Sequence, residues 1–265
     1  MRRGFSLVEL SIVLVILGLL VGGILAGRSL IRASELRAVG TEYQRYKTAT
    51  HAFRDKYFAV PGDFAQATRV WGRLVANAQC VTNNSAAVNA TGGACDGNGD
   101  GMIDRATSNS RSGENFQVWR QLALAGLIEG SYTGIAGTND NDEHIMGENH
   151  PVSKLANGGW GAEYATASVA SPQNYAVQYG NYFIIGSYNE NSKPNRMVMR
   201  PEEAWNIDTK LDDGQPGYGI VIARYHNNQC AVPTDGNSDG GADLNGSYNL
   251  ADTSILCALY FARQY

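Results

Sequence analysis

The sequence predicts an α+β protein in which one long amino-terminal α-helix packs on a globular head with a small antiparallel sheet. Residues 5–27 are almost uniformly apolar, residues 36–57 repeat large apolar side chains at helical spacing, and later segments are rich in aromatic and β-branched residues. We expect a leader peptide at residues 1–4, the helix at 5–60 and one head at 61–265. No linker rich in proline or charge divides the head.

The first residues combine a basic start with a long apolar run. Met1-Arg2-Arg3-Gly4 precedes FSLVELSIVLVILGLLVGGILAG, which a single charge, Glu9, interrupts. About twenty apolar residues in a helix span a bilayer core of about 30 Å. Arg2 and Arg3 favour a cytoplasmic near end, although Arg28 and Arg32 on the far side weaken the charge bias. We therefore expect residues 5–27 to cross a membrane.

Two other interpretations of this segment are a secretory signal peptide and a plain membrane anchor. A signal peptide has an apolar segment of about 7–15 residues, shorter than this one. Neither alternative explains Glu9, because a carboxylate in hydrocarbon costs at least about 2.5 kcal/mol. A partner for Glu9 is expected.

The octapeptide Arg3-Gly4-Phe5-Ser6-Leu7-Val8-Glu9-Leu10 resembles the class III signal of type IV pilins and type II secretion pseudopilins. The resemblance implies that prepilin peptidase cleaves after Gly4 and that Phe5, the first mature residue, is N-methylated. It also implies a partner for Glu9, the amino group of Phe5 on a neighbouring subunit. Such a buried charge pair is a means of fixing register between helices. The resemblance covers roughly the first sixty residues.

Beyond Gly27 the predicted helix becomes amphipathic. The face expected to pack against the head comprises Leu36, Val39, Tyr43, Tyr46, Thr50, Phe53 and Tyr57. The opposite face comprises Arg37, Glu42, Arg45, Lys47, Arg54 and Asp55. Pro61-Gly62 supplies the stop, so the helix would run about 80 Å at 1.5 Å per residue. Gly18, Gly22 and Gly23 either let the apolar half bend during assembly or mark helix contacts.

Three segments of the head have a clear periodicity. Residues 115–128 follow a helical pattern that ends before Gly130, and residues 179–188 and 218–225 are the best strand candidates. These elements would supply the sheet and a second helix against which the long helix packs.

The four cysteines fall into two local pairs, Cys80 with Cys95 and Cys230 with Cys257. Four cysteines allow three connectivities, and the alternative is four reduced core thiols. Each local pair would close a short loop, with a stabilisation of about 3 kcal/mol on the loop-entropy model. Oxidised pairs would place the head outside the cytoplasm. The 230–257 loop is also similar to the disulfide-closed carboxy-terminal loop of many pilins.

Two acidic loops alternate oxygen-bearing side chains with glycine, in a pattern that resembles EF-hand or dockerin calcium loops. The first candidate ligand set is Asp96, Asn98, Asp100, Asp104 and Glu114, and the second is Asp235, Asn237, Asp239 and Asp243. Both loops lack the bidentate glutamate at the twelfth position, where Thr107 and Gly246 stand. We expect one or two calcium ions, and solvated turns are the alternative. Calcium-stabilised loops are known in pilins and pseudopilins.

A third acidic run, Asp208, Asp212 and Asp213, is expected to cap structural elements rather than bind metal. No nucleophile elbow, phosphate-binding loop with lysine or paired-histidine zinc motif is present, so enzymatic activity is not expected. The four histidines are scattered. His144 follows the acidic stretch 140–143, where a solvated loop is expected and a transition-metal site is the alternative.

Function is therefore expected to be structural. The resemblance implies a precursor in the inner membrane that prepilin peptidase and an assembly platform convert into a homo-oligomeric filament. The filament would be an extracellular pilus or a periplasmic pseudopilus of a type II secretion system. The head is large for a major subunit, which favours a specialised or minor subunit. The alternative from another functional class is a binding module, a minor-pilin adhesin or a DNA-binding tip. The net charge of -4 argues against nucleic-acid binding, which needs a basic surface.

Overall fold

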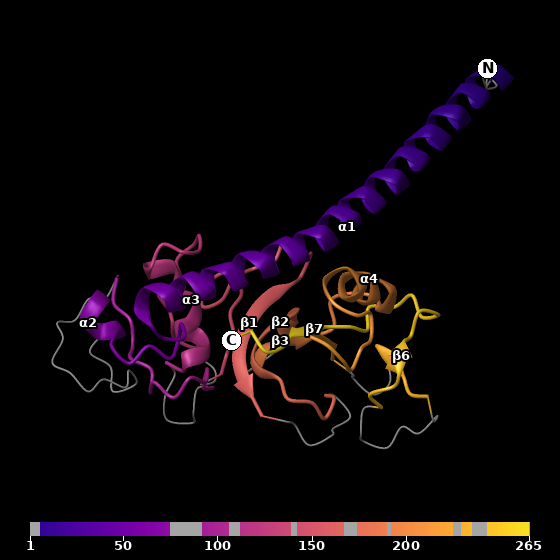
Figure 1. Cartoon of the computed structure of the whole chain (residues 1–265). Helices are drawn as coiled ribbons and strands as arrows, with labels where there is room; N and C mark the ends of the chain where they lie inside the picture. The colour runs from indigo at the N-terminus through magenta and orange to yellow at the C-terminus, as the bar shows by residue number, and fades with distance from the viewer. Residues whose placement is uncertain are drawn as a thin grey trace.

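The computed structural model describes residues 6–74, 92–105, 112–138, 142–166, 174–189, 192–224, 229–234 and 243–264. Figure 1 shows one long helix whose amino-terminal half projects away from the head and whose carboxy-terminal half lies along it. This arrangement confirms the predicted α+β class. Gly4 and Phe5 lie outside the described residues.

Helix α1, Leu7–Tyr57, is 51 residues long. Ser6 caps its amino terminus through its side chain, and Phe58, in the left-handed conformation at φ 54°, ends it. The helix is continuous through Gly18, Gly22 and Gly23, so none of these glycines breaks it in the isolated chain. The helix ends three residues before the predicted bound at residue 60.

The buried face of α1 follows the predicted stripe. Val39, Tyr43, Tyr46, Thr50 and Phe53 are buried, and Leu36 and Tyr57 are partly buried against the same cluster. Because the period of an α-helix is fixed at 3.6 residues, spacing alone identified this face. Glu42 was assigned to the opposite, charged face, and that assignment is wrong because its side chain is buried.

The main sheet follows the order β1-β2-β7-β4, and β3 pairs with β2. All its pairings are antiparallel. Its strands are β1 Gly159–Ala165, β2 Gly180–Asn189, β3 Ser192–Arg196, β4 Val221–Ala223 and β7 Leu259–Phe261. A small second sheet pairs β5, Ala231–Val232, with β6, Ser247–Tyr248. The carboxy-terminal strand β7 thus lies inside the main sheet, between β2 and β4.

The strand prediction for residues 179–188 matches β2 closely. The prediction for 218–225 was too long within the described residues, because β4 begins only at Val221. Gly219, at φ 72°, belongs to the turn that precedes the strand. Tyr225 lies outside the described residues.

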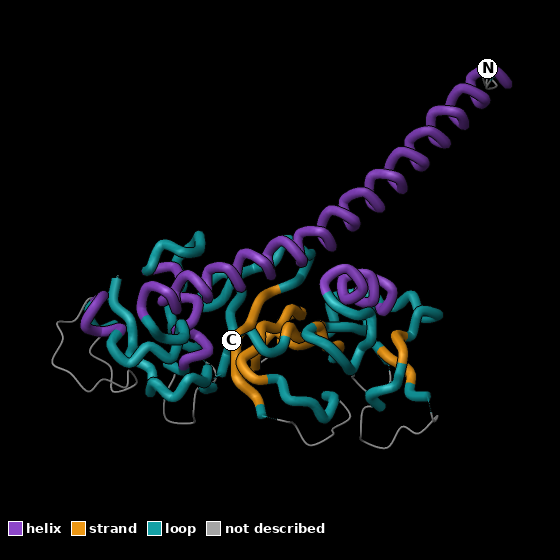
Figure 2. Tube along the Cα trace, in the orientation of Figure 1, coloured by secondary structure: helices purple, strands orange, loops and turns teal. Residues whose placement is uncertain are grey.

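Three shorter helices complete the head: α2 Ala67–Trp71, α3 Glu114–Leu124 and α4 Pro201–Leu211. The predicted helix at 115–128 ends four residues earlier than expected, since Gly126 adopts φ 72° in the turn that terminates α3. Helix α4 was not predicted, although Pro201 at its start with Glu202 and Glu203 in the first turn is a typical amino-terminal signal. Figure 2 shows the strands in the middle of the head with α3 and α4 on opposite sides of them.

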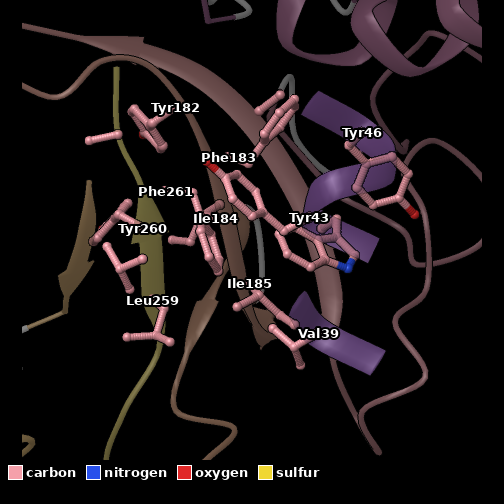
Figure 3. Packing of buried hydrophobic residues seen from close by; sticks show 14 of the residues in the cluster. Val39, Tyr43, Tyr46, Tyr182, Phe183, Ile184, Ile185, Leu259, Tyr260 and Phe261 are labelled. Atoms are coloured by element: carbon pink, nitrogen blue, oxygen red, sulfur yellow. The ribbon is translucent and has the colours of Figure 1, made fainter. Parts of the chain in front are cut away.

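Aromatic side chains join α1 to the sheet. Tyr43 stacks on Phe261 of β7 with ring centroids 4.3 Å apart, and Tyr46 meets Trp119 and Trp160 edge-on at 5.1 and 5.5 Å. Figure 3 shows Val39 and Tyr43 pointing from the helix toward the sheet residues. Aromatic pairs of this kind contribute about 0.5–1.5 kcal/mol each beyond the burial of their area.

Candidate assembly helix and metal-binding loops

The amino-terminal half of α1 is an exposed apolar rod. Its most apolar 18-residue window has a mean hydropathy of 2.7, and none of that window is buried within the chain. By length and composition the helix is able to cross a membrane. Leu7, Leu19 and Leu30 each expose more than 70% of their surface. An apolar helix with no face covered requires lipid or other helices around it.

Glu9 lies at the amino terminus of this rod. One carboxylate oxygen accepts a hydrogen bond from the backbone N–H of Ser6 at 2.9 Å. The Ser6 hydroxyl in turn accepts from the backbone N–H of Val8 at 3.3 Å. This reciprocal capping box satisfies two backbone donors and places the negative charge at the positive end of the helix dipole. In the isolated chain the carboxylate therefore caps its own helix.

Arg32, at the middle of α1, ties the start of its carboxy-terminal half to the head beside α4. Its Nε and Nη2 atoms donate to the two carboxylate oxygens of Glu203 at 2.7 and 2.6 Å. Nη2 also donates to the carbonyl oxygen of Val198 at 3.2 Å, and Nη1 to Glu35 at 3.1 Å. The side chains of Arg32 and Glu203 are 28% and 12% exposed. Such a bidentate, partly desolvated pair fixes direction as well as distance.

Glu42 provides a second, buried anchor of α1. Its carboxylate accepts hydrogen bonds from the Ser153 hydroxyl at 2.6 Å, the Lys154 backbone N–H at 2.8 Å and the Trp160 indole N–H at 2.8 Å. Three donors compensate for the desolvation of one carboxylate. The sequence held no signal for this role, because the donors lie more than a hundred residues away.

The first acidic loop brings part of the predicted ligand set together. The Asn98 Nδ2 atom donates to Asp100 and to Asp104, both at 3.0 Å. The other two candidates bind protein groups. Asp96 accepts from the backbone N–H and the hydroxyl of Thr68 at 2.7 and 2.8 Å, near the start of α2. Glu114 accepts from the backbone N–H groups of Asn98 and Asp104, both at 2.8 Å.

Asp63, which the sequence analysis missed, also belongs to this loop. Its two carboxylate oxygens accept from the backbone N–H groups of Gly99 at 2.5 Å and Gly101 at 2.7 Å. Asp63 directly follows Pro61-Gly62, and that dipeptide was interpreted only as the signal that ends the helix. A carboxylate directly after a turn, opposite a glycine-rich loop, was the available signal.

The carboxyl groups of this loop repel one another. Burial raises the pKa of Glu114 to about 8, and the charges of Asp63 and Asp104 add to the increase. Burial likewise raises the pKa of Asp104, with a further contribution from Asp100. Carboxylates, an amide oxygen and backbone carbonyls form the donor set that calcium prefers. The Asn98 amide presents its nitrogen, a donor, to Asp100 and Asp104, and its oxygen accepts from the Asp100 N–H at 2.9 Å. The first calcium site therefore stays a prediction.

Only Asp243 of the second candidate loop lies within the described residues, and Asp235, Asn237 and Asp239 lie outside them. Asp243 accepts from the backbone N–H and hydroxyl of Thr234 at 2.7 and 2.5 Å, and from the Asn245 N–H at 2.9 Å. It closes the turn that leads into β6. The second calcium site stays a prediction.

The third acidic run caps elements, as expected. Carboxylate oxygens of Asp208, Asp212 and Asp213 lie within 4.8 Å of one another. Asp208 accepts from the Tyr248 hydroxyl at 2.8 Å and the Gly214 N–H at 3.2 Å. Asp212 accepts from the N–H groups of Ile220 and Val221, and Asp213 from that of Gln215. Each carboxylate therefore has protein donors.

One predicted disulfide lies within the described residues. Cys230 is bonded to Cys257, with Cα atoms 5.0 Å apart. Cys95 is also disulfide-bonded, and Cys80, its predicted partner, lies outside the described residues. The Cys230–Cys257 bond ties the short β5–β6 sheet to the segment that leads into β7.

Comparison with known protein families finds a match for one segment of the chain. Residues 1–25 match the model of the prokaryotic N-terminal methylation motif. No curated protein and no solved structure matches the chain. The matched segment holds the basic start, Glu9 and most of the exposed apolar rod. The chain therefore carries the amino-terminal signal of type IV pilin and pseudopilin precursors.

Proposed function

We propose that this chain is a structural, non-enzymatic subunit of a type IV pilus-like extracellular filament, assembled through α1. The observation that carries the proposal is that the two halves of α1 have different environments. Its amino-terminal half is apolar and exposed on all sides, while its carboxy-terminal half is anchored in the head by Arg32, Glu42 and the tyrosine stripe. A rod of this kind, held rigidly by a head, suits insertion first into a membrane and then among the helices of other copies.

Before assembly the precursor is anchored in the inner membrane with its head outside the cytoplasm, and prepilin peptidase removes residues 1–4. The methylation motif supports this order. The Cys230–Cys257 disulfide supports an oxidising destination for the head. An inner-membrane assembly platform then adds the subunit to a homo-oligomeric filament. No nucleic-acid partner is proposed.

Within the filament, Glu9 exchanges its contact with the Ser6 N–H for the amino group of Phe5 on a neighbouring copy. Two variants separate this role from helix capping. Glu9→Gln keeps an acceptor for the cap but removes the charge, whereas Ser6→Ala removes the capping hydroxyl and keeps the charge. We expect Glu9→Gln to lower incorporation into filaments about tenfold or more, since a buried charge then lacks its partner. Ser6→Ala is expected to assemble normally.

Intact-mass spectrometry on sheared filaments and on the membrane fraction tests the proposal. A filament composed mainly of this chain, beginning at methylated Phe5 and lacking four cysteine hydrogens, is the expected result. The same processed mass confined to the cell envelope would instead identify a type II secretion pseudopilin or a scarce minor subunit. Mature material that still carries residues 1–4 would overturn both forms of the proposal.

We further propose that the loop of Asn98, Asp100 and Asp104 binds calcium, which would offset the repulsion among its carboxylates. The proximity of Asp100 and Asp104, which share the Asn98 amide nitrogen as donor, supports this ligand set. The role would be structural, because the loop already contacts α3 through the bonds from the Asn98 and Asp104 N–H groups to Glu114.

A further inference from the structure

A groove with a volume of about 620 Å³ lies between α1 and α4. Figure 1 shows α4 beside α1 at the place where the apolar rod leaves the head. The floor of the groove consists of Leu36 and Gly40 of α1 and of Ile207 and Leu211 of α4. Leu36 and Leu211 are only partly buried, so both walls are apolar surfaces that the chain leaves partly uncovered. Uncovered apolar surface of this kind marks a contact with another molecule.

The rim of the groove is positively charged. Arg37 of α1 and Lys210 in the last turn of α4 line it, and both residues are exposed. Among the described residues that line the groove, Glu203 is the only carboxylate, and it already accepts two hydrogen bonds from Arg32. An occupant that combines apolar side chains with a negative charge therefore matches both the floor and the rim.

The chain presents this combination itself, in a short loop between β6 and β7. Leu250 and Ile255 are 50% and 55% exposed, and Asp252 between them is partly exposed. In the described part of the head, no other two exposed large apolar side chains lie so close in sequence. We call residues 250–255 the β6–β7 knob.

The knob is held in one shape before any contact is made. The Asp252 carboxylate accepts from the backbone N–H of Ser254 at 2.8 Å, and the Asp252 N–H donates to the carbonyl oxygen of Asn249 at 3.1 Å. The disulfide between Cys230 and Cys257 fixes the end of the same loop. A preformed surface loses little conformational entropy on binding.

We propose that the β6–β7 knob of one copy docks into the α1–α4 groove of a neighbouring copy, an inference that rests on the proposed filament function. Leu250 and Ile255 contact the apolar floor, and Asp252 pairs with Arg37 and Lys210 of the neighbour. Because two different surfaces of one chain meet, the contact is heterologous. Such a contact extends into an open helical filament unless the rotation between copies closes a ring.

The contact orients the heads rather than holding the filament together. Stable protein interfaces bury about 1,200–2,000 Å² in total, which is more than one short loop provides. The apolar rods supply the larger part of the contact between copies. Opposite charges at a small contact select orientation and exclude incorrect arrangements. The knob and the groove therefore set the rotation of each head about the bundle of rods.

Charge reversal tests the contact in filaments sheared from cells that express the full-length chain. We expect Asp252→Lys to lower the filament yield about tenfold or more, because it brings a third positive charge to Arg37 and Lys210. The double variant Arg37→Glu, Lys210→Glu should lose a similar fraction. The triple variant that carries all three substitutions restores opposite charges and should recover most of the wild-type yield.

Glu129→Lys is the matched control, since it makes the same charge change at a side chain that is 94% exposed and lies outside both surfaces. It should assemble as wild type does. The melting temperatures of the detergent-solubilised variants should equal that of wild type, which distinguishes a lost contact from a lost fold. If wild type forms filaments and the knob and groove variants assemble normally, or if the triple variant assembles as poorly as the others, the contact is wrong and the filament function stands. If wild type forms no filament, the proposed function fails and the contact fails with it.

A cysteine pair locates the contact. Lys210→Cys combined with Asp252→Cys should give disulfide-linked multimers in mildly oxidised filaments, whereas either substitution alone should not, since the described native cysteines offer no free thiol. Multimers formed instead by Lys210→Cys combined with Leu30→Cys would assign the groove to the rod of another copy. Washed filaments that retain phospholipid and form neither cross-link would assign it to lipid. Either of these last two results would overturn the proposed contact.

Discussion

The Glu42 carboxylate of α1 accepts a hydrogen bond from the indole N–H of Trp160 in β1 at 2.8 Å, in the interior of the head. The same carboxylate receives the Ser153 hydroxyl and the Lys154 backbone N–H. Removing the carboxylate would therefore leave three donors unpaired. The junction between helix and head depends on this side chain as much as on the apolar stripe beside it.

We expect Glu42→Gln to lower the free energy of unfolding by about 1–3 kcal/mol, because the amide offers one acceptor oxygen in place of two. Thermal and denaturant unfolding of the detergent-solubilised chain measure the change. Glu129→Gln, with a side chain 94% exposed, is the control and should be nearly neutral. Equal stabilities for the two variants would contradict the anchoring role of Glu42.

The Arg32–Glu203 pair is expected to show a coupling energy of about 1 kcal/mol in a double-mutant cycle with Arg32→Gln and Glu203→Gln. The bidentate contact and partial burial raise the coupling above that of an open surface pair. Arg45 and Glu129 provide the matched comparison, with a 3.8 Å separation and side chains 46% and 94% exposed. Their coupling should be close to zero, and similar values for both cycles would refute the ranking.

Asp208 makes stability depend on pH. Burial raises its pKa to about 7, despite the hydrogen bond from Tyr248. The folded-state pKa exceeds the ordinary value of 3.8, so folding favours the protonated Asp208 carboxyl. The contribution of Asp208 to the free energy of unfolding is therefore complete below about pH 4 and is lost as the pH rises through about 7.

Asp208→Asn should therefore lose this part of the pH dependence between pH 4 and 8, measured as the difference in melting temperature from wild type. Asp213→Asn, at an exposed neighbour, serves as the control and should follow the wild-type profile. Parallel profiles for wild type and Asp208→Asn would show that Asp208 does not titrate differently in the folded chain.

Calcium should raise the melting temperature, and a chelator should lower it, if the loop of Asn98, Asp100 and Asp104 binds the ion. Calcium at a hundredfold excess over its Kd stabilises a protein by about 2.7 kcal/mol. The double variant Asp100→Asn, Asp104→Asn should lose this response, while Asp55→Asn on the exposed face of α1 should keep it. Unchanged melting temperature and protease resistance after chelation would disprove the assignment.

Replacing Cys230 and Cys257 by serine should cost about 2–4 kcal/mol, because the bond closes a loop with a sequence separation of 27. Unfolding of the double variant under non-reducing conditions measures this loss. The effect should concentrate at β5 and β6, so limited proteolysis is expected to cut between the two cysteines first. Wild-type stability in the variant would show that the sheet alone fixes this region.

The predictable parts of this protein depend on local sequence. The motif around Glu9, the length of α1 and its buried stripe from Val39 to Phe53 follow from composition and helical period, which need no knowledge of the rest of the chain. Strand β2 was also predictable, since aromatic and β-branched residues mark it.

The parts that sequence could not determine depend on contacts between distant residues. From its charge alone Glu42 was expected to face solvent, but in the folded chain it accepts hydrogen bonds from Trp160 and Ser153. Asp63 accepts the Gly101 N–H only because the turn after α1 brings the two residues together. His144 was expected in a solvated loop because its neighbours in sequence are acidic. That expectation is wrong, since folding buries it beside His150. The sequence determined which segment carries the methylation motif and the period of the faces of α1, because these are local properties of one helix. The tertiary structure alone decided which polar groups are buried and what pairs with them, because burial depends on long-range packing.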